Sequence, residues 1–140
     1  MTDYKNLVKE AIEARKMAYA PYSHYKVGAA LLSKDGQIIR GCNIENASYT
    51  PTNCAERTAF FKAISEGVRD FKAIAIVGGD ESQTEELAGY AYPCGVCRQV
   101  MREFCDDEFE IIVGKSTEEY MVYKLPELLP CGFGPDDLNK

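Results

Sequence analysis

The sequence predicts an α/β fold, with a five-stranded mixed sheet and helices on both faces of it. Segments with helical and strand patterns follow one another in the order helix, hairpin, helix, strand, helix, strand, strand. One short apolar run, 71–77, is rich in isoleucine and valine, which is typical of a strand covered on both sides. The chain of 140 residues suits one hydrophobic core, and we expect residues 1–140 to form a single domain.

The first helix is expected over residues 2–19, where apolar residues recur at intervals of three and four, with Thr2 or Asp3 as its N-cap. A proline-containing loop, 20–24, ends this helix and holds His24, the only histidine of the chain. A lone histidine in a loop is more often a polar surface residue than a metal ligand. We therefore expect no metal role for His24.

Two antiparallel strands are predicted next, over residues 25–32 and 37–44. The Asp-Gly pair within 33–36 is a strong signal for the hairpin turn between them. A polar connection, 43–52, then leads into a second helix, expected over 53–66 and ended by a glycine.

The second half of the chain begins with the buried strand 71–77, followed by an acidic, irregular stretch, 78–92, that is predicted to be a surface loop. A proline then opens a third helix, expected over 93–105. Two strands are expected over 109–114 and 119–124, and the tail has room for one short helix at 127–129 and little else.

Charge and hydropathy restrict the partners. The formal net charge is −6 and the pI is about 4.9, so the chain lacks the basic balance of most polynucleotide-binding proteins. A small uncharged ligand is the better expectation, and no nucleic acid partner is predicted. No apolar stretch approaches the ~20 residues needed to span a bilayer, and we expect no membrane partner. The N-terminal segment has no pattern of an export signal, which favours a cytoplasmic location.

Three of the six cysteines have metal-ligand spacing. Cys94 and Cys97 form a Cys-x-x-Cys pair at a predicted helix start, which taken alone fits a redox pair and a metal site equally well. Cys54 favours the metal, because it also begins a helix and a redox dithiol needs no third sulfur. Soft sulfur ligands select zinc, and three protein ligands leave one position open, as in catalytic sites. Cys42, Cys105 and Cys131 have no spacing that joins this cluster, and we assign them no chemistry.

Glu56 is two residues from Cys54 and is the predicted proton-transfer group. Alone it would be read as part of a capping box with Asn53, three residues before it. Three thiolates around zinc leave a formal charge of −1, which weakens the acidity of a bound water, so a compensating positive charge is expected. Arg57 is predicted to contact a ligand, whereas Arg98 is equally well explained as a surface residue.

Several motifs carry a resemblance to one family, namely Ala20-Pro-Tyr-Ser, Val27-Gly-Ala-Ala-Leu-Leu, Gly41-Cys-Asn-Ile-Glu-Asn-Ala-Ser-Tyr, Cys54-Ala-Glu-Arg, Pro93-Cys-Gly-Val-Cys-Arg-Gln and Glu127-Leu-Leu-Pro. Together they resemble the small homotetrameric cytidine deaminases. The zinc-deaminase signature of Cys-x-Glu followed by Pro-Cys-x-x-Cys is present. The resemblance runs nearly end to end and implies a three-layer α/β/α sandwich, one Zn²⁺ per chain with an activated water, and hydrolysis of cytidine and deoxycytidine to the uridines plus ammonia, as in pyrimidine salvage.

The resemblance also implies roles for individual residues. It makes Cys54, Cys94 and Cys97 the zinc ligands and Glu56 the proton shuttle. It makes Asn43 and Glu45 the readers of the ribose hydroxyls, and the backbone of Ala55 the contact for the base carbonyl. Tyr25, where the family commonly has phenylalanine, would stack on the pyrimidine, and its hydroxyl needs a partner. Phe133 in the tail would close the active site of a neighbouring subunit in a homotetramer with shared sites.

Two alternatives remain open. Blasticidin-type deaminases share the zinc motifs and the Glu-Leu-Leu-Pro tail, but the Asn43-x-Glu45 motif, which would read a ribose, favours a nucleoside. A non-catalytic zinc-binding module would be expected to close its site with a fourth ligand, and no fourth ligand is evident in the sequence.

Overall fold

The computed structural model describes residues 1–139 and contains a five-stranded sheet in the order β2-β1-β3-β4-β5. Only the pairing of β3 with β4 is parallel, and the other three pairings are antiparallel, so the mixed sheet is confirmed. The strands are β1 (Tyr25–Ser33), β2 (Ile38–Cys42), β3 (Phe71–Asp80), β4 (Glu110–Ser116) and β5 (Glu119–Lys124).

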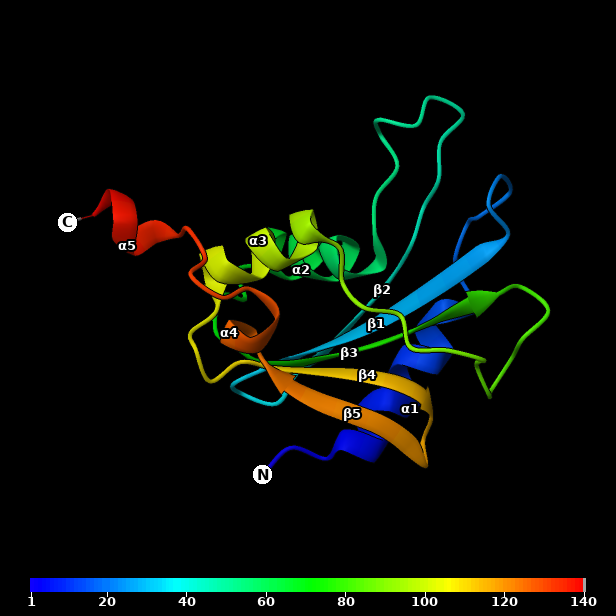
Figure 1. Ribbon diagram of the computed structural model, residues 1–140, viewed down its shortest axis with the longest axis horizontal. Helices are drawn as coiled ribbons and strands as arrows, with labels where there is room; N and C mark the ends of the chain where they lie inside the picture. Colours follow the sequence, from blue (N-terminus) through cyan, green and yellow to red (C-terminus); the bar gives the residue numbers. More distant parts are fainter. Residues whose placement is uncertain (140) are drawn as a thin grey trace.

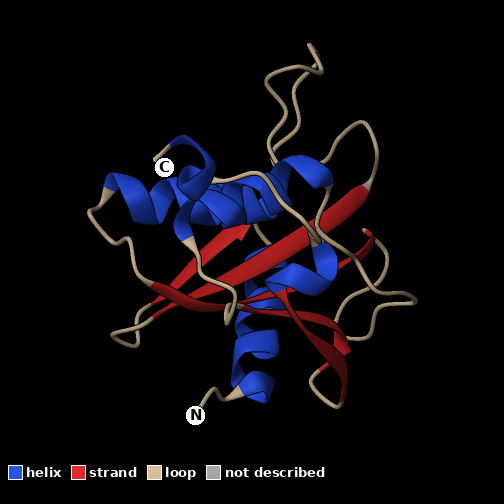
Figure 2. Cartoon of the chain, turned by 60° about the vertical axis from the view of Figure 1, so that its left-hand side comes forward, coloured by secondary structure: helices blue, strands red, loops and turns tan. Residues whose placement is uncertain are grey.

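Helices cover both faces of this sheet. One helix, α1, packs on one face, whereas α2 and α3 lie side by side on the other, as Figures 1 and 2 show. The three-layer α/β/α arrangement is therefore confirmed. The helices are α1 (Tyr4–Arg15), α2 (Ala55–Ser65), α3 (Gly95–Phe104), α4 (Leu125–Leu128) and α5 (Pro135–Leu138). No helix within residues 1–139 is long and apolar enough to cross a membrane.

The central strand β3 supplies side chains to two separate hydrophobic clusters, because successive residues of a strand point to opposite faces. Ile74 and Ile76 belong to the cluster under α2 and α3, and Ala73 and Ala75 belong to the cluster under α1. All four are fully buried. This double coverage explains why the strand reads as a continuous apolar run instead of an alternating one.

The end of β3 differs from its prediction. The strand continues to Asp80, three residues beyond the expected end at residue 77, because β1 remains paired with it through Lys26↔Gly79 and Tyr25↔Asp80. Arg15, at the end of α1, also holds this region: its side chain is only 5% exposed and donates to the carbonyl oxygens of four residues. Those residues and distances are Lys26 (2.8 Å), Gly79 (2.9 Å), Asp80 (2.7 Å) and Gln83 (2.6 Å).

The tail also differs from its prediction. It contains α4, close to the short helix expected at 127–129, but it then forms a second short helix, α5. The expectation of a single helix was wrong because Pro135 suits the first position of a helix and the Asp137 side chain accepts the backbone N–H of Gly134 (2.8 Å).

Candidate active site

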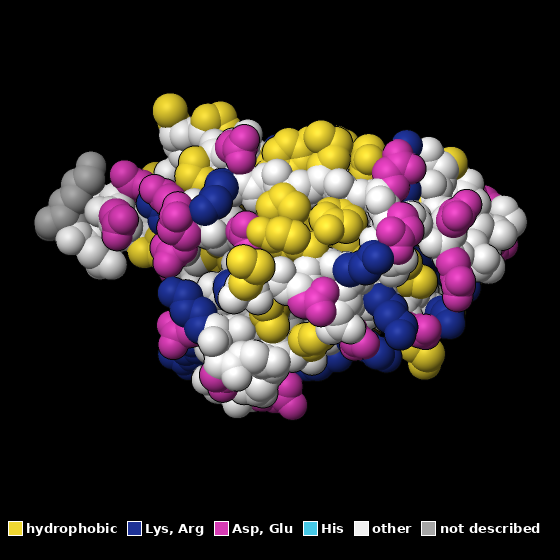
Figure 3. Space-filling model, turned by 90° about the horizontal axis from the view of Figure 1, so that it is seen from below, with side chains coloured by type: hydrophobic (Ala, Val, Ile, Leu, Met, Phe, Trp, Pro, Cys, Tyr) yellow, Lys and Arg dark blue, Asp and Glu magenta, His cyan; other side chains and the backbone are white. Residues whose placement is uncertain are grey.

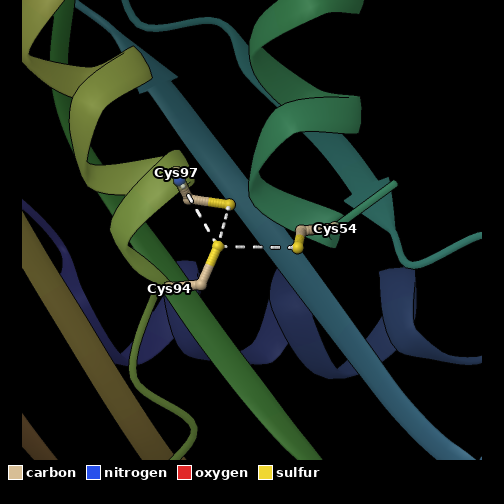
Figure 4. A group of neighbouring side chains, drawn as sticks. All are labelled: Cys54, Cys94 and Cys97. Atoms are coloured by element: carbon tan, nitrogen blue, oxygen red, sulfur yellow. Dashed lines mark hydrogen bonds between the residues drawn. The ribbon is translucent and has the colours of Figure 1, made fainter. Parts of the chain in front are cut away.

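Three cysteine sulfurs meet where α2 and α3 begin. Cys54 is the N-cap residue of α2, Cys94 is the N-cap residue of α3, and Cys97 lies in the first turn of α3. The Sγ atom of Cys94 is 3.8 Å from that of Cys54 and 3.4 Å from that of Cys97 (Figure 4). All three sulfurs lie within 4.8 Å of one another, so one ion can contact them all.

The sheet positions the two helix starts. A side chain at Gly41 in β2 would overlap the carbonyl oxygen of Ala55, so glycine at this position lets the start of α2 lie directly on the strand. At the start of α3, the backbone N–H of Cys97 points to the sulfur of Cys94 over 3.4 Å. The positive end of α3 therefore faces the sulfur of Cys94.

The chemistry of this cluster fits zinc. Thiolates are soft ligands that select zinc over magnesium or calcium. Within the described residues 1–139, the cluster contains three potential ligands and no fourth. A three-ligand set leaves the last tetrahedral position for water or substrate, which is typical of catalytic zinc and not of structural zinc.

Two arginines follow the cysteines, and the structure distinguishes their roles. Arg57 donates a hydrogen bond from Nη2 to the sulfur of Cys54 over 3.1 Å, as expected. The interaction with the Cys97 thiol and this guanidinium together lower the pKa of Cys54 to about 5. Arg98 instead donates to the carbonyl oxygens of Pro93 (2.8 Å) and Leu128 (2.6 Å). Its observed role is to hold the chain before α3 and the end of α4 together.

Glu56 is 4% exposed and lies in the first turn of α2. It does not form a capping box with Asn53, because the N-cap residue is Cys54 and the Asn53 amide donates to the hydroxyl of Thr58 (3.2 Å). Burial raises the pKa of Glu56 to about 7, and the nearby Cys54 charge acts in the same direction. A carboxyl group with a pKa near neutrality is suited to both accepting and donating a proton.

A cavity of about 320 Å³ opens beside Glu56 and the cysteines. Most of the sequence-predicted site residues line it, although they come from β1, the connection after β2, the start of α2 and the segment before α3. The lining residues are Tyr25, Val27, Asn43, Thr52, Asn53, Cys54, Ala55, Glu56, Ile76, Tyr90, Ala91, Tyr92 and Cys94. The size is in the range of small-molecule sites.

Asn43 and Glu45 lie in the connection that follows β2, and both bind the chain that precedes and begins β1. The Asn43 side chain accepts from the backbone N–H of Val27 (2.8 Å) and donates to the carbonyl of Tyr25 (2.9 Å). The Glu45 carboxylate accepts from the backbone N–H groups of Tyr22 (3.0 Å) and Ser23 (3.1 Å) and from the Ser23 hydroxyl. Each side chain retains further hydrogen-bonding capacity, since an amide has two N–H donors and a carboxylate about four acceptor sites.

Glu45 lines a second cavity of about 290 Å³ that adjoins the first through Thr52. Its other lining residues, Tyr22, Asn46 and Tyr49 among them, lie in loop 20–24 and in the long connection between β2 and α2. That connection projects away from the body of the molecule (Figure 1).

The sequence-based prediction missed one wall of the cavity. It placed Phe133 at the site of a neighbouring subunit and not at this cavity. Tyr90, Ala91 and Tyr92 line the cavity, although the stretch 78–92 was expected to be a surface loop. Phe133 is 57% exposed, and its carbonyl accepts from the Gln99 side chain (2.8 Å) on the outer side of α3. The residues that line the cavity within 1–139 do not include Phe133.

The α/β/α fold and a zinc-compatible cysteine cluster beside a buried glutamate define the class as zinc-dependent hydrolytic deaminases. The family model described as the cytidine and deoxycytidylate deaminase zinc-binding region matches residues 1–113. The chain therefore belongs to the cytidine deaminase family, and zinc is its cofactor.

Individual relatives agree with this assignment. The cytidine deaminase of Halalkalibacterium halodurans is 51% identical over 137 residues, which cover 98% of each chain. The crystal structure of the cytidine deaminase from Burkholderia pseudomallei has a TM-score of 0.83 at 46% identity, covering 95% of this chain and all of that one. A blasticidin-S deaminase of Bacillus cereus is 36% identical over 128 residues, covering 91% of this chain and 89% of its own.

Proposed function

We propose that this protein hydrolyses cytidine and deoxycytidine to uridine and deoxyuridine, with release of ammonia, in pyrimidine salvage. The observation that carries the proposal is the buried Glu56 carboxyl group beside three converging cysteine thiols at one cavity. Zinc held by Cys54, Cys94 and Cys97 would lower the pKa of a water molecule and so supply hydroxide near neutral pH.

Glu56 is the proton shuttle in this proposal. It takes a proton from the attacking water and delivers it to the ring nitrogen of the pyrimidine as oxygen adds to the amino-bearing carbon. It then takes the remaining proton of the added hydroxyl and transfers it to the departing amino group, so that the new carbonyl forms as the C–N bond breaks and ammonia leaves. Its burial supports this role, because a pKa near 7 makes both proton transfers accessible at neutral pH.

Four residues would orient the nucleoside. Tyr25 would stack on the pyrimidine, and the backbone of Ala55 would hold the base carbonyl. Asn43 and Glu45 would bind the ribose hydroxyls with the hydrogen-bonding capacity that their contacts to residues 22–27 leave open. Tyr25, Asn43 and Ala55 all line the cavity, which supports these assignments.

We also propose a homotetramer in which Phe133 reaches a neighbouring subunit's site. Its exposure, away from the cavity of its own chain, supports this. Figure 3 shows hydrophobic side chains gathered on the face seen from below, the side of Figure 1 on which β5 lies, and Met121 and Val122 of β5 are among the exposed hydrophobic residues. Such patches are typical of protein interfaces. Sedimentation should give four chains per particle, and a fully active monomer would refute the shared sites.

The direct test is to incubate the zinc-loaded protein with cytidine and to follow the ultraviolet absorbance change together with ammonia release. We expect turnover that is lost when a chelator removes the zinc and recovered when zinc is returned. A protein with one zinc per chain that leaves cytidine and deoxycytidine unchanged would refute the proposal. Turnover of blasticidin S alone would instead support the alternative function of a blasticidin-type deaminase, to which the 36% identical relative points.

A further inference from the structure

We infer that Tyr90 is a substrate-contacting residue of this site and that Lys115 positions it. The inference rests on the proposed nucleoside deaminase function and extends it to a segment that carries no deaminase motif. Tyr90 lines the cavity that also contains Cys54, Glu56 and Tyr25. Lys115 lies in β4, whose end adjoins the segment that carries Tyr90.

Lys115 holds this segment at two points. Its backbone carbonyl accepts the N–H of Leu87 over 2.9 Å, and Leu87 is itself only 5% exposed. Its ammonium group lies over the ring of Tyr90, 4.8 Å from the ring centroid. A cation at this distance from a ring face is attracted by the ring quadrupole. The two contacts together fix both the path of the chain and the orientation of the Tyr90 ring.

The residues after Tyr90 are fixed as well. A Cβ atom at Gly78 would come within 2.8 Å of the Ala91 Cβ and 3.2 Å of a ring carbon of Tyr25, so Ala91 and Tyr25 both crowd the same glycine. The Tyr92 ring centroid is 6.4 Å from that of Tyr90 and 6.1 Å from that of Tyr123 in β5. Tyr90 therefore belongs to an ordered aromatic wall and not to a loose surface loop.

This arrangement determines which surface of the ring meets a ligand. Since the ammonium of Lys115 covers one face of Tyr90, the cavity is left with the other face or the edge. An aromatic surface of this kind suits a planar pyrimidine, because stacking on a base tolerates small differences in the base. Such a contact forms in the ground state and persists in the transition state, so it should lower KM and leave kcat nearly unchanged.

A purely structural explanation makes different predictions. Lys115 also forms an ion pair with Glu119 over 3.6 Å, and Tyr90 packs against the core cluster under α2 and α3. If these contacts were the whole role of the two residues, replacing them would change stability but not nucleoside affinity. The two explanations are separated by measuring ligand affinity beside stability.

The experiment compares Tyr90→Leu, Lys115→Met, Lys115→Arg and Glu119→Gln in the zinc-loaded protein. It measures KM and kcat for cytidine, Kd for uridine by calorimetry, zinc content and thermal unfolding. For Tyr90→Leu we expect KM and Kd to rise about tenfold, with kcat within about twofold of the parent. For Lys115→Met we expect a rise of about two- to fivefold, which Lys115→Arg largely recovers because arginine also binds ring faces. Glu119→Gln is the matched control, since it removes the ion pair and leaves the ring contact.

The double variant Tyr90→Leu/Lys115→Met decides whether Lys115 acts through the ring. We expect it to bind uridine as Tyr90→Leu does, with no additional loss. An unchanged Kd in Tyr90→Leu, or a loss from Lys115→Met that persists without the ring, overturns the inference. If Tyr90→Leu folds poorly, the Lys115 variants still test the inference: a Kd in Lys115→Met that equals the Kd in Glu119→Gln would overturn it. A parent protein that neither deaminates cytidine nor binds uridine would refute the proposed function instead, so the two failures are distinguishable.

Discussion

The guanidinium group of Arg57 donates a hydrogen bond to the sulfur of Cys54 over 3.1 Å from within the first turn of the same helix. This contact offsets part of the negative charge that three thiolates bring to one ion. Replacing Arg57 by glutamine should lower zinc affinity about 10- to 100-fold, the usual cost of removing a group that orients or supports a metal ligand. Competition with a chromogenic chelator at fixed pH measures this change.

Arg98 provides the comparison, because its hydrogen bonds go to the carbonyls of Pro93 and Leu128. Arg98→Gln should lower the free energy of unfolding but leave the zinc affinity close to that of the parent. Equal zinc affinities in Arg57→Gln and the parent would show that the helix ends alone compensate the thiolate charge.

Glu56→Gln separates a proton shuttle from a structural residue. The substitution keeps the size of the side chain, and no capping hydrogen bond is lost, since Cys54 is the N-cap residue. General acid–base catalysis contributes typically 10²–10⁴-fold, so kcat should fall by at least about a hundredfold while zinc content and the unfolding midpoint stay near parental values. Single-turnover kinetics with cytidine measure the loss. Turnover above a few per cent of the parent rate in a zinc-loaded variant would refute the mechanism.

Nucleotides should be poor substrates if the sugar lies beside Glu45. The hydrogen bond from Ser23 is the main cause that lowers the pKa of Glu45, so the carboxylate is charged at neutral pH and repels a 5′-phosphate. Like-charge contacts are unfavourable, and kcat/KM for cytidine should exceed that for CMP by more than about a hundredfold. Because the pKa is depressed, this discrimination should persist down to pH values below the ordinary range of a glutamate. Glu45→Gln should narrow the ratio, and equal kcat/KM values for the two substrates in the parent would contradict this placement.

Arg15 is predicted to contribute to stability through backbone contacts alone. All four of its hydrogen bonds end on carbonyl oxygens, and burial lowers its pKa. Arg15→Met leaves these carbonyls without their donor, so the free energy of unfolding should fall by about 3 kcal/mol. Urea unfolding measures the change, with the exposed neighbour Lys16→Met as the control. A loss below about 1 kcal/mol would mean that water replaces the guanidinium.

Much of the fold follows from local patterns. Helix periodicity in α1, the Asp35-Gly36 turn and the apolar run of β3 each contain their own signal, and the structure confirms all three elements. The end of β3 could not be predicted, because two consecutive glycines in a sequence usually indicate that a strand has ended. The strand is extended by its pairing with β1 and by hydrogen bonds from Arg15, a residue that lies 64 positions before Gly79 in the chain.

The site divides in the same way. The zinc cluster and Glu56 could be predicted because each group of site residues is closely spaced in the sequence and lies at the start of one helix. Their catalytic roles stay predictions. Tyr90 and Tyr92 could not be predicted, because their place in the cavity depends on Lys115 and on the packing of Ala91 over Gly78. No periodicity in the stretch 78–92 reports those contacts. The direction of Arg98 was likewise open until the position of Leu128 was known.

The division of the sulfurs between two helices has a consequence for how the protein is made. The β1–β2 hairpin can close as soon as it leaves the ribosome, since its pairing is local. Cys54 then emerges, but its partner Cys94 is synthesised 40 residues later. A nascent chain therefore carries an unliganded thiol at the start of α2 while β3 and the loop after it are still being made. Zinc can join the two helices only after Cys94 and Cys97 have been made, and cells short of zinc should accumulate chains whose hairpin is formed but whose α2 and α3 are not held together by the metal.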